Sequence, residues 1–121
     1  MSTPIGPYSP IVRAGDLLFT SGQLGVVAGP EGAPELVAGG TAAQATQALA
    51  NAAALLESEG ATKTDVVKAT VFLTDMADFA ALNEVWVAFF DGHRPARSAI
   101  GVAALPMGAS VEIELIARLR G

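Results

Sequence analysis

Arg97 and Glu112 stand at the two ends of an uncharged stretch, Ser98 to Val111. A guanidinium presents N–H donors in a fork that matches both oxygens of a carboxylate, so a fixed Arg97 would bind a small organic acid. A glutamate in a dry cleft has a raised pKa and can exchange a proton with water near neutral pH. The pair therefore permits a site that holds a small carboxylate beside a proton-transferring group.

Both residues also have a purely structural interpretation. An intramolecular salt bridge of Arg97, including one with Glu112, is the favoured interpretation from sequence alone, because structural ion pairs outnumber binding sites. Glu112 is followed on the same strand face by Glu114, which also fits a pair of solvated glutamates. The functional and structural interpretations both stay open at this point.

Two further segments offer polar groups to a ligand. Tyr8, the only tyrosine, lies in a proline-framed turn, where its ring either covers a pocket or packs against the protein. Ser21 and Gly22 follow a predicted strand, where they either expose backbone N–H groups to a ligand or form a plain turn.

Composition argues against several other kinds of site. The chain has no cysteine and a single histidine, His93, in a Gly-His-Arg-Pro loop where solvation is expected. The carboxylates and the imidazole show no metal-ligand spacing, so no metal site is expected. No glycine-rich phosphate loop opens a helix. The net charge of -5, with no run of Lys or Arg, argues against nucleic acid as a partner.

The length of 121 residues predicts a single domain, residues 1–121. Charged residues make up 16% of the chain, against about 25% in a typical soluble domain, which favours an oligomer with shared surface. The N-terminus lacks a basic head and an apolar stretch, and no window of about 18 apolar residues is unbroken. We therefore expect no signal peptide, no membrane contact and a cytoplasmic location.

Strands and helices alternate in the segments that must position these residues. The predicted strands are 11–12, 17–21, 66–74, 97–102 and 110–119, and the predicted helices run from Thr41 to about Gly60 and from Asp75 or Asp78 to about Asp91. The segment 25–40 is rich in glycine and proline and is predicted to be mostly loop, with brief pairing at 36–37. Thr41 and Gln44 fit a capping box.

The apolar residues of these elements predict how they pack. The first helix presents Ala45, Ala48, Leu49, Ala52, Leu55 and Leu56, the second presents Phe79, Leu82, Trp86, Phe89 and Phe90, and the last strand presents Val111, Ile113, Leu115, Ala117 and Leu119. The order predicts an α+β domain with both helices on one face of a single mixed sheet. We expect a partner subunit to cover the opposite face, which carries Glu112 and Ile116.

Four segments together resemble the reactive intermediate deaminase family, RidA/YjgF. They read IGPYSP, LLFTSGQL, VVKATVFLTDMADFAALNEVW and PARSAIGVAALPMGASVEIELIA, in the family's order. The resemblance implies a chorismate-mutase-like fold, a homotrimer with clefts between subunits, and hydrolysis of reactive enamino or imino acids, such as 2-aminoacrylate and 2-iminopropanoate, to a 2-keto acid and ammonia. It implies no cofactor.

The resemblance also implies roles for individual residues. Arg97 of the ARS motif would clamp the substrate carboxylate, and Glu112, the first glutamate of VEIE, would position or activate the attacking water. Tyr8 would help enclose the substrate. Ser21 and Gly22 of the SGQ motif, and Asn83 in the second helix, would lie near the ligand.

Two positions depart from the family pattern. Many relatives have cysteine where this chain has Ala99, so a backbone contact to the ligand would survive here but a thiol contact would not. Met107 stands where a polar residue often follows Leu-Pro. Three other functions stay open: aminoacrylate hydrolysis in a pyrimidine-degradation pathway, a regulatory trimer that binds 2-keto acids without catalysis, and a ribonuclease, which the acidic charge disfavours.

Overall fold

The computed structural model describes residues 6–120, so Ile5 of the IGPY motif lies outside the described part. The strands are β1 (Ile11–Ala14), β2 (Leu17–Thr20), β3 (Val26–Ala28), β4 (Pro34–Leu36), β5 (Val66–Leu73), β6 (Ala96–Gly101) and β7 (Val111–Arg118), and the helices are α1 (Gly40–Ser58) and α2 (Phe79–Phe90). The predicted elements are all present, with boundaries shifted by a few residues.

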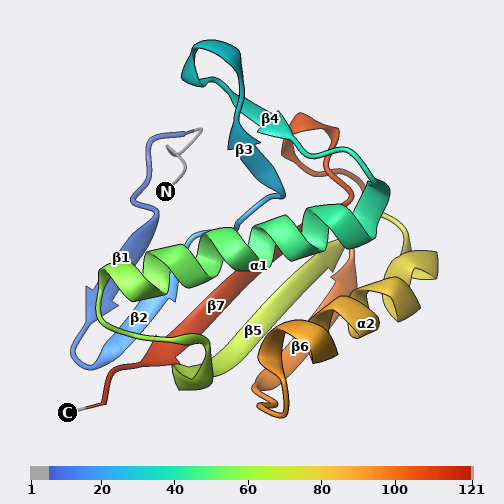
Figure 1. Cartoon of the computed structure of the whole chain (residues 1–121). Coiled ribbons are helices and arrows are strands. Elements are labelled where there is room, and N and C mark those ends of the chain that lie inside the picture. Colours follow the sequence, from blue (N-terminus) through green and yellow to red (C-terminus); the bar gives the residue numbers. More distant parts are fainter. Residues whose placement is uncertain (1–5, 121) are drawn as a thin grey trace.

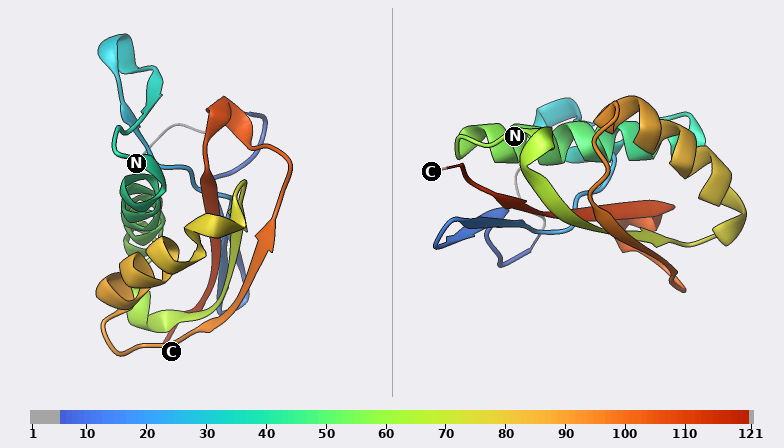
Figure 2. Two further views of the ribbon diagram at one scale, coloured as in Figure 1. Left: turned by 90° about the vertical axis from the view of Figure 1, so that its right-hand side faces the viewer. Right: turned by 90° about the horizontal axis from the view of Figure 1, so that it is seen from below.

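The main sheet has five strands in the order β1-β2-β7-β5-β6. β5 and β6 are parallel, and the other neighbouring pairs are antiparallel. Both helices cover the same face of this sheet, which leaves its opposite face open in the single chain (Figures 1 and 2). The predicted α+β architecture, with a mixed sheet and two helices on one face, is confirmed.

The segment predicted to be mostly loop contains a second, two-stranded sheet. β3 pairs with β4 in antiparallel register, with Val26 opposite Leu36 and Ala28 opposite Pro34. This ribbon projects from the long side of α1 (Figure 1). Gly25, just before it, must be glycine because an added Cβ would lie 2.5 Å from the Gln44 backbone of α1.

The core lies between the two helices and the covered face of the sheet. The predicted face of α1 is confirmed, since its buried residues are Ala45, Ala48, Leu49, Ala52, Leu55 and Leu56. The alternation of β7 is confirmed as well, with Val111, Ile113, Leu115 and Ala117 buried and Leu119 packed at the margin. Small alanine side chains allow α1 to lie close to the strands beneath it.

Thr41 and Gln44 do not form the predicted capping box. Gly39 is the N-cap residue of α1 and provides no side-chain cap. Thr41 Oγ1 instead donates to Asp78 Oδ2 at 2.7 Å, and Gln44 Oε1 accepts from the Ser110 backbone N–H at 2.9 Å. The prediction is wrong because both polar groups tie α1 to the starts of α2 and β7 in place of its own first turn.

His93 was predicted to be a solvated loop residue, and this prediction is wrong because the side chain is half-buried. Its Nε2 lies 2.7 Å from the Val66 carbonyl oxygen, at the start of β5. The ring therefore fixes the loop that leads from α2 into β6.

Within residues 6–120, no helix is long and apolar enough to cross a membrane.

Candidate active site

Arg97 lies on the helix-covered side of the sheet, at its β6 edge. In the parallel pairing Arg97 is opposite Ala69 of β5, and Ala69 is buried beneath the helices. The Arg97 guanidinium carbon lies 5.4 Å from the centroid of the Phe79 ring and 5.1 Å from that of Trp86, both on α2. The side chain is thus half-buried between the sheet edge and α2.

The favoured structural interpretation of Arg97, an intramolecular salt bridge, is wrong for the described chain. The ion pairs found within residues 6–120 are Arg118–Asp16 at 2.9 Å and Arg120–Asp65 at 2.7 Å. Burial lowers the pKa of Arg97, but the ordinary arginine pKa is so far above neutrality that the group stays charged. The guanidinium keeps its fork of donors available to an added carboxylate.

Asn83 and Ala99 lie on the same side of the sheet as Arg97. Asn83 is four residues after Phe79 and three before Trp86, so on a helix it belongs to the same stripe as the two rings. Ala99 follows Arg97 by two residues on β6, is opposite buried Val71, and packs at the margin of the core. One polar and one small side chain therefore lie on the same side of the sheet as the guanidinium.

Glu112 lies on the open face of the sheet, where it is opposite Phe72 of β5. Its side chain is half-buried. Burial, and secondarily the neighbouring charge of Glu114, raise the pKa of Glu112 above that of an ordinary glutamate. A raised pKa suits a carboxylate that takes a proton from water and then returns it.

Gly22 approaches the carboxyl group of Glu112 so closely that any larger residue would displace the Glu112 side chain. An added Cβ would lie 2.7 Å from both Cδ and Oε2 of Glu112. The contact is fixed by a pair of backbone hydrogen bonds one residue further on, in which Gln23 N–H donates to Ile113 O at 2.8 Å and Ile113 N–H donates to Gln23 O at 3.0 Å. Gly22 and Glu112 therefore form one unit.

Ser21 anchors the turn that carries Tyr8. The Ser21 hydroxyl donates to Ser9 O at 2.7 Å, and its backbone N–H donates to Pro10 O at 2.8 Å. Both of its donors are thus used within the chain, so of the two interpretations of Ser21 the structure favours a turn over an N–H that is exposed to a ligand. Tyr8 has 46% of its surface exposed. The hydrogen bond from Ser21 to Ser9 holds the turn of Tyr8 next to the segment that carries Gly22.

The structure thus sorts the candidate residues into two groups. The first, on the helix-covered side, contains Arg97, Asn83 and Ala99. The second, around the open face, contains Glu112, Gly22, Ser21 and Tyr8. β5 separates β6 from β7, which places the strands of Arg97 and Glu112 about 10 Å apart, and the two side chains leave the sheet in opposite directions.

Comparison with known proteins shows which family has both this fold and these sequence motifs. The sequence matches the family described as endoribonuclease L-PSP over residues 1–119. The chain belongs to this family. It is the same family as RidA/YjgF, which the motifs of the sequence resemble.

The chain is similar over most of its length to a named deaminase and to solved structures. The 2-iminobutanoate/2-iminopropanoate deaminase of Bos taurus is 47% identical over 93% of this chain and 80% of its own length. RidA from an Antarctic Psychrobacter has a TM-score of 0.89 at 47% identity, covering 98% of this chain and 93% of that one. E. coli TdcF with bound serine has a TM-score of 0.87 at 41% identity, with coverage of 98% and 93%.

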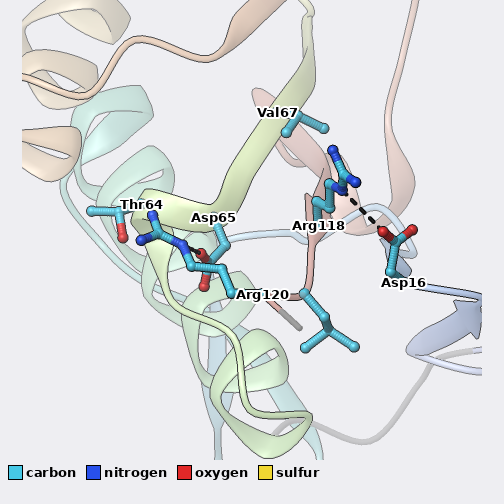
Figure 3. Close-up of a pocket in the computed structure, with 7 residues that line it drawn as sticks. Asp16, Thr64, Asp65, Val67, Arg118 and Arg120 are labelled. Atoms are coloured by element: carbon cyan, nitrogen blue, oxygen red, sulfur yellow. Dashed lines mark hydrogen bonds and ion pairs between the residues drawn. The ribbon is translucent and has the colours of Figure 1, made fainter.

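A hollow at the other end of β7 is separate from both groups of candidate residues. It has a volume of about 470 Å³ and is lined by Asp16, Thr64, Asp65, Val67, Arg118, Leu119 and Arg120. Figure 3 shows its two arginines directed at the aspartates with which they pair. Arg118 lies six residues beyond Glu112, about 20 Å along the strand, and its charge is already compensated.

Across residues 6–120, no three His, Cys, Asp or Glu side chains gather to hold a metal ion.

Phe79 and Trp86 are residues of the candidate site that the sequence patterns assigned to the core. Trp86 is buried as predicted, but Phe79 keeps 37% of its surface exposed. The difference arises because the first turn of α2 extends past the core and over Arg97. An aromatic pair seven residues apart on a helix, preceding a strand with an isolated arginine, was the signal available in the sequence.

Proposed function

We propose that the protein is a deaminase that hydrolyses 2-imino acids, and their enamine tautomers, to 2-keto acids and ammonia. The observation that carries the proposal is the half-buried guanidinium of Arg97, which has no ion-pair partner among residues 6–120. Such a group is a receptor for a small carboxylate. Relatives at 43–47% identity named 2-iminobutanoate/2-iminopropanoate deaminase, and a relative that holds bound serine, support a substrate with this group.

The proposed site is assembled from two copies of the chain. Arg97 and Glu112 leave opposite faces of the sheet, so the Arg97 side of one copy must meet the Glu112 side of the next. Two different surfaces in contact form a head-to-tail interface, which gives a ring when the rotation between successive subunits closes. A homotrimer with three such clefts, as the family resemblance implies, fulfils this requirement.

The open face of the sheet is suited to covering by a second copy. Cross-strand neighbours Val12, Phe19 and Ile116 form an apolar row over β1, β2 and β7. Val12 is 53% and Phe19 37% exposed in the single chain. A contiguous apolar surface of this kind marks an interaction site, and it lies on the same face of the sheet as Glu112, which is four residues from Ile116 along β7.

In the proposed reaction, Arg97 binds the substrate carboxylate through both oxygens and so fixes the imine carbon. Protonation of the imine nitrogen makes that carbon electrophilic. Water attacks it while the Glu112 carboxylate accepts one of the water protons, giving a carbinolamine. Glu112 then returns that proton to the nitrogen, the C–N bond breaks and ammonia leaves, while the hydroxyl group gives its proton to the Glu112 carboxylate as the C=O bond of the 2-keto acid forms. The departing ammonia takes this proton as ammonium, which restores the carboxylate.

The raised pKa of Glu112 supports both proton transfers. A more basic carboxylate takes the proton from water more readily, and the resulting acid still protonates an amine nitrogen. General acid–base help and positioning each contribute about 10²-fold or more. These contributions suffice for a substrate that already hydrolyses in water, so the proposal requires no cofactor.

The test generates 2-aminoacrylate in situ with a serine dehydratase and measures pyruvate release. The wild type should accelerate release, and Arg97→Ala should lower kcat/KM by about 10²–10³-fold, because a desolvated charge pair is lost. Arg97→Lys should restore little, since an ammonium lacks the fork. Matched circular dichroism and oligomer size would show that the variants are folded.

A second candidate function rests on the same arginine. A trimer that binds 2-keto acids without catalysis would bind pyruvate in an Arg97-dependent way but leave pyruvate release at the uncatalysed rate. A role in pyrimidine degradation would require a different aminoacrylate substrate at the same site. RNA cleavage, suggested by the family description, should be absent; cleavage that persists in an Arg97→Ala, Glu112→Ala double variant would come from another site or a contaminant.

A further inference from the structure

The guanidinium of Arg97 is flanked by two aromatic rings. Its carbon lies 5.4 Å from the centroid of the Phe79 ring and 5.1 Å from that of Trp86, within the distance at which a cation is attracted to a ring face. A half-buried charge with no carboxylate partner in residues 6–120 requires some compensation for lost water. The two rings provide it.

Compensation of the Arg97 charge by aromatic rings differs from a salt bridge because the N–H donors of the guanidinium stay free. A carboxylate would occupy the N–H donors at the edge of the guanidinium, whereas a ring attracts the cation without accepting those hydrogen bonds. The donors therefore remain available to a substrate carboxylate. An internal acidic partner would instead compete with that substrate.

The geometry of α2 explains why these two residues reach Arg97. Phe79 and Trp86 are seven residues apart, so they lie on one face of the helix. Trp86 is 4% exposed, and its ring packs on Phe90 with a centroid separation of 4.9 Å, which fixes it in the core. Phe79 begins α2 and is 37% exposed, so it forms the outer wall.

We propose that Phe79 and Trp86 are positioning residues that hold the Arg97 guanidinium in the orientation required for substrate binding. This inference rests on the proposed function and assigns a role to two residues within it. Because the rings act on carboxylate binding and not on water attack, their loss should raise KM and leave kcat nearly unchanged. The more exposed Phe79 is the better position for a test, since its substitution disturbs the core least.

The experiment compares Phe79→Leu, which removes the ring but keeps an apolar side chain, with Phe79→Tyr, which keeps the ring. The matched control is Phe89→Leu: Phe89 lies on the same helix, half-buried, with its ring near Lys63 and Phe90. Phe79→Leu should raise KM for 2-aminoacrylate, and the dissociation constant for pyruvate, by about 3- to 10-fold. Phe79→Tyr and Phe89→Leu should stay near the wild type.

A readout without ligand separates this inference from the proposed function. The Arg97 Nε–Hε resonance, assigned by its loss in Arg97→Ala, should shift in Phe79→Leu because a neighbouring ring current disappears, and should not shift in Phe89→Leu. If the wild type fails to hydrolyse 2-aminoacrylate, the proposed function is wrong, yet the resonance and pyruvate binding still test the positioning role. An unchanged resonance in Phe79→Leu, or equal effects of Phe79→Leu and Phe89→Leu, would overturn the inference.

Discussion

Arg97 and Glu112 project from opposite faces of the same sheet. Arg97 is opposite Ala69 of β5, whose side chain is buried under the helices, whereas Glu112 is opposite Phe72, three residues further along β5 and on the other face. Successive side chains along a strand point to opposite faces of the sheet. Because Ala69 and Phe72 are an odd number of residues apart on β5, their partners Arg97 and Glu112 point to opposite faces. One chain can therefore contribute Arg97 to one cleft and Glu112 to another, but cannot bring both to a single substrate.

The first prediction is that two inactive variants complement each other. Arg97→Ala and Glu112→Gln should each be at least about 10²-fold less active than the wild type. Co-expressed with different tags and purified as mixed oligomers, they should recover activity, because about one third of the head-to-tail interfaces in a mixed trimer then combine an intact Arg97 with an intact Glu112. Pyruvate release from 2-aminoacrylate measures the recovery.

The control for complementation is a mixture of the two separately purified variants, assayed before subunits exchange. This mixture should show only the sum of the parental activities. A mixed oligomer that is no more active than this sum would mean that Arg97 and Glu112 do not meet across an interface.

The second prediction concerns the pH dependence set by Glu112 and Glu114. Burial and the charge of Glu114 raise the pKa of Glu112, so kcat/KM should rise with pH through a pKa above that of an ordinary glutamate. Glu114→Gln removes the repulsive charge and should move this rise to lower pH. Rate profiles of wild type and Glu114→Gln over the acidic range test this; superimposable profiles would exclude the influence of Glu114.

The same raised pKa predicts a pH-dependent difference in stability. Below the unfolded-state pKa of about 4.3, Glu112 is protonated in both the folded and the unfolded state, and its burial carries no charge penalty. As pH rises through the folded-state pKa, the wild type must bury a charge and loses stability relative to Glu112→Gln. Thermal unfolding should therefore show the variant more stable at pH 8 and equal at pH 4. A variant that is less stable at pH 8 would contradict this.

The elements and the core followed from local patterns in the sequence. The buried face of α1 and the alternation of β7 were predicted correctly, because each depends on apolar spacing within one element. The polar contacts of Thr41 and His93 were not predicted, because their partners, Asp78 and Val66, lie far away in the chain. Interactions of that kind depend on how elements pack.

The candidate site also depends on how distant elements pack, which limits what the sequence alone could predict about it. Residue types and positions alone identified Arg97 and Glu112 as the chemically interesting pair and pointed to Gly22, and family motifs added Asn83. Sequence could not show that Arg97 and Glu112 occupy opposite faces, because the face of a short edge strand such as β6 depends on its register with β5. That register excludes a salt bridge between Arg97 and Glu112 within one chain, and the ion pairs found among residues 6–120 do not include Arg97.

The third prediction is that Gly22→Ala impairs activity more than stability. Its Cβ would lie 2.7 Å from the Glu112 carboxyl carbon, and the flexible end of that side chain can move aside. The fold should persist while the carboxylate is displaced from the water, so kcat should fall by about 10-fold or more. In a Glu112→Ala background the space is free, and Gly22→Ala should then have no further effect. A further loss in that background would show that Gly22 acts independently of Glu112.

The fourth prediction uses Ala99 as a reporter of carboxylate binding. The chain contains no cysteine, so Ala99→Cys introduces a single thiol about 7 Å along β6 from Arg97 and on the same side of the sheet. Iodoacetamide should modify this thiol, and pyruvate bound to Arg97 should slow the modification. Mass spectrometry of the intact protein over time gives the rates.

Two variants show whether the protection arises from Arg97. In Arg97→Ala, Ala99→Cys, pyruvate has no guanidinium to bind, so the modification rate should be the same with and without it. A thiol at the exposed α1 position, introduced by Thr46→Cys, should also react at one rate, because Thr46 lies on the exposed surface of α1 whereas Arg97 lies at the β6 edge of the sheet against α2. Protection that survives the loss of Arg97 would mean that pyruvate is held near Ala99 by another group, and Arg97 would then lose its place as the carboxylate receptor.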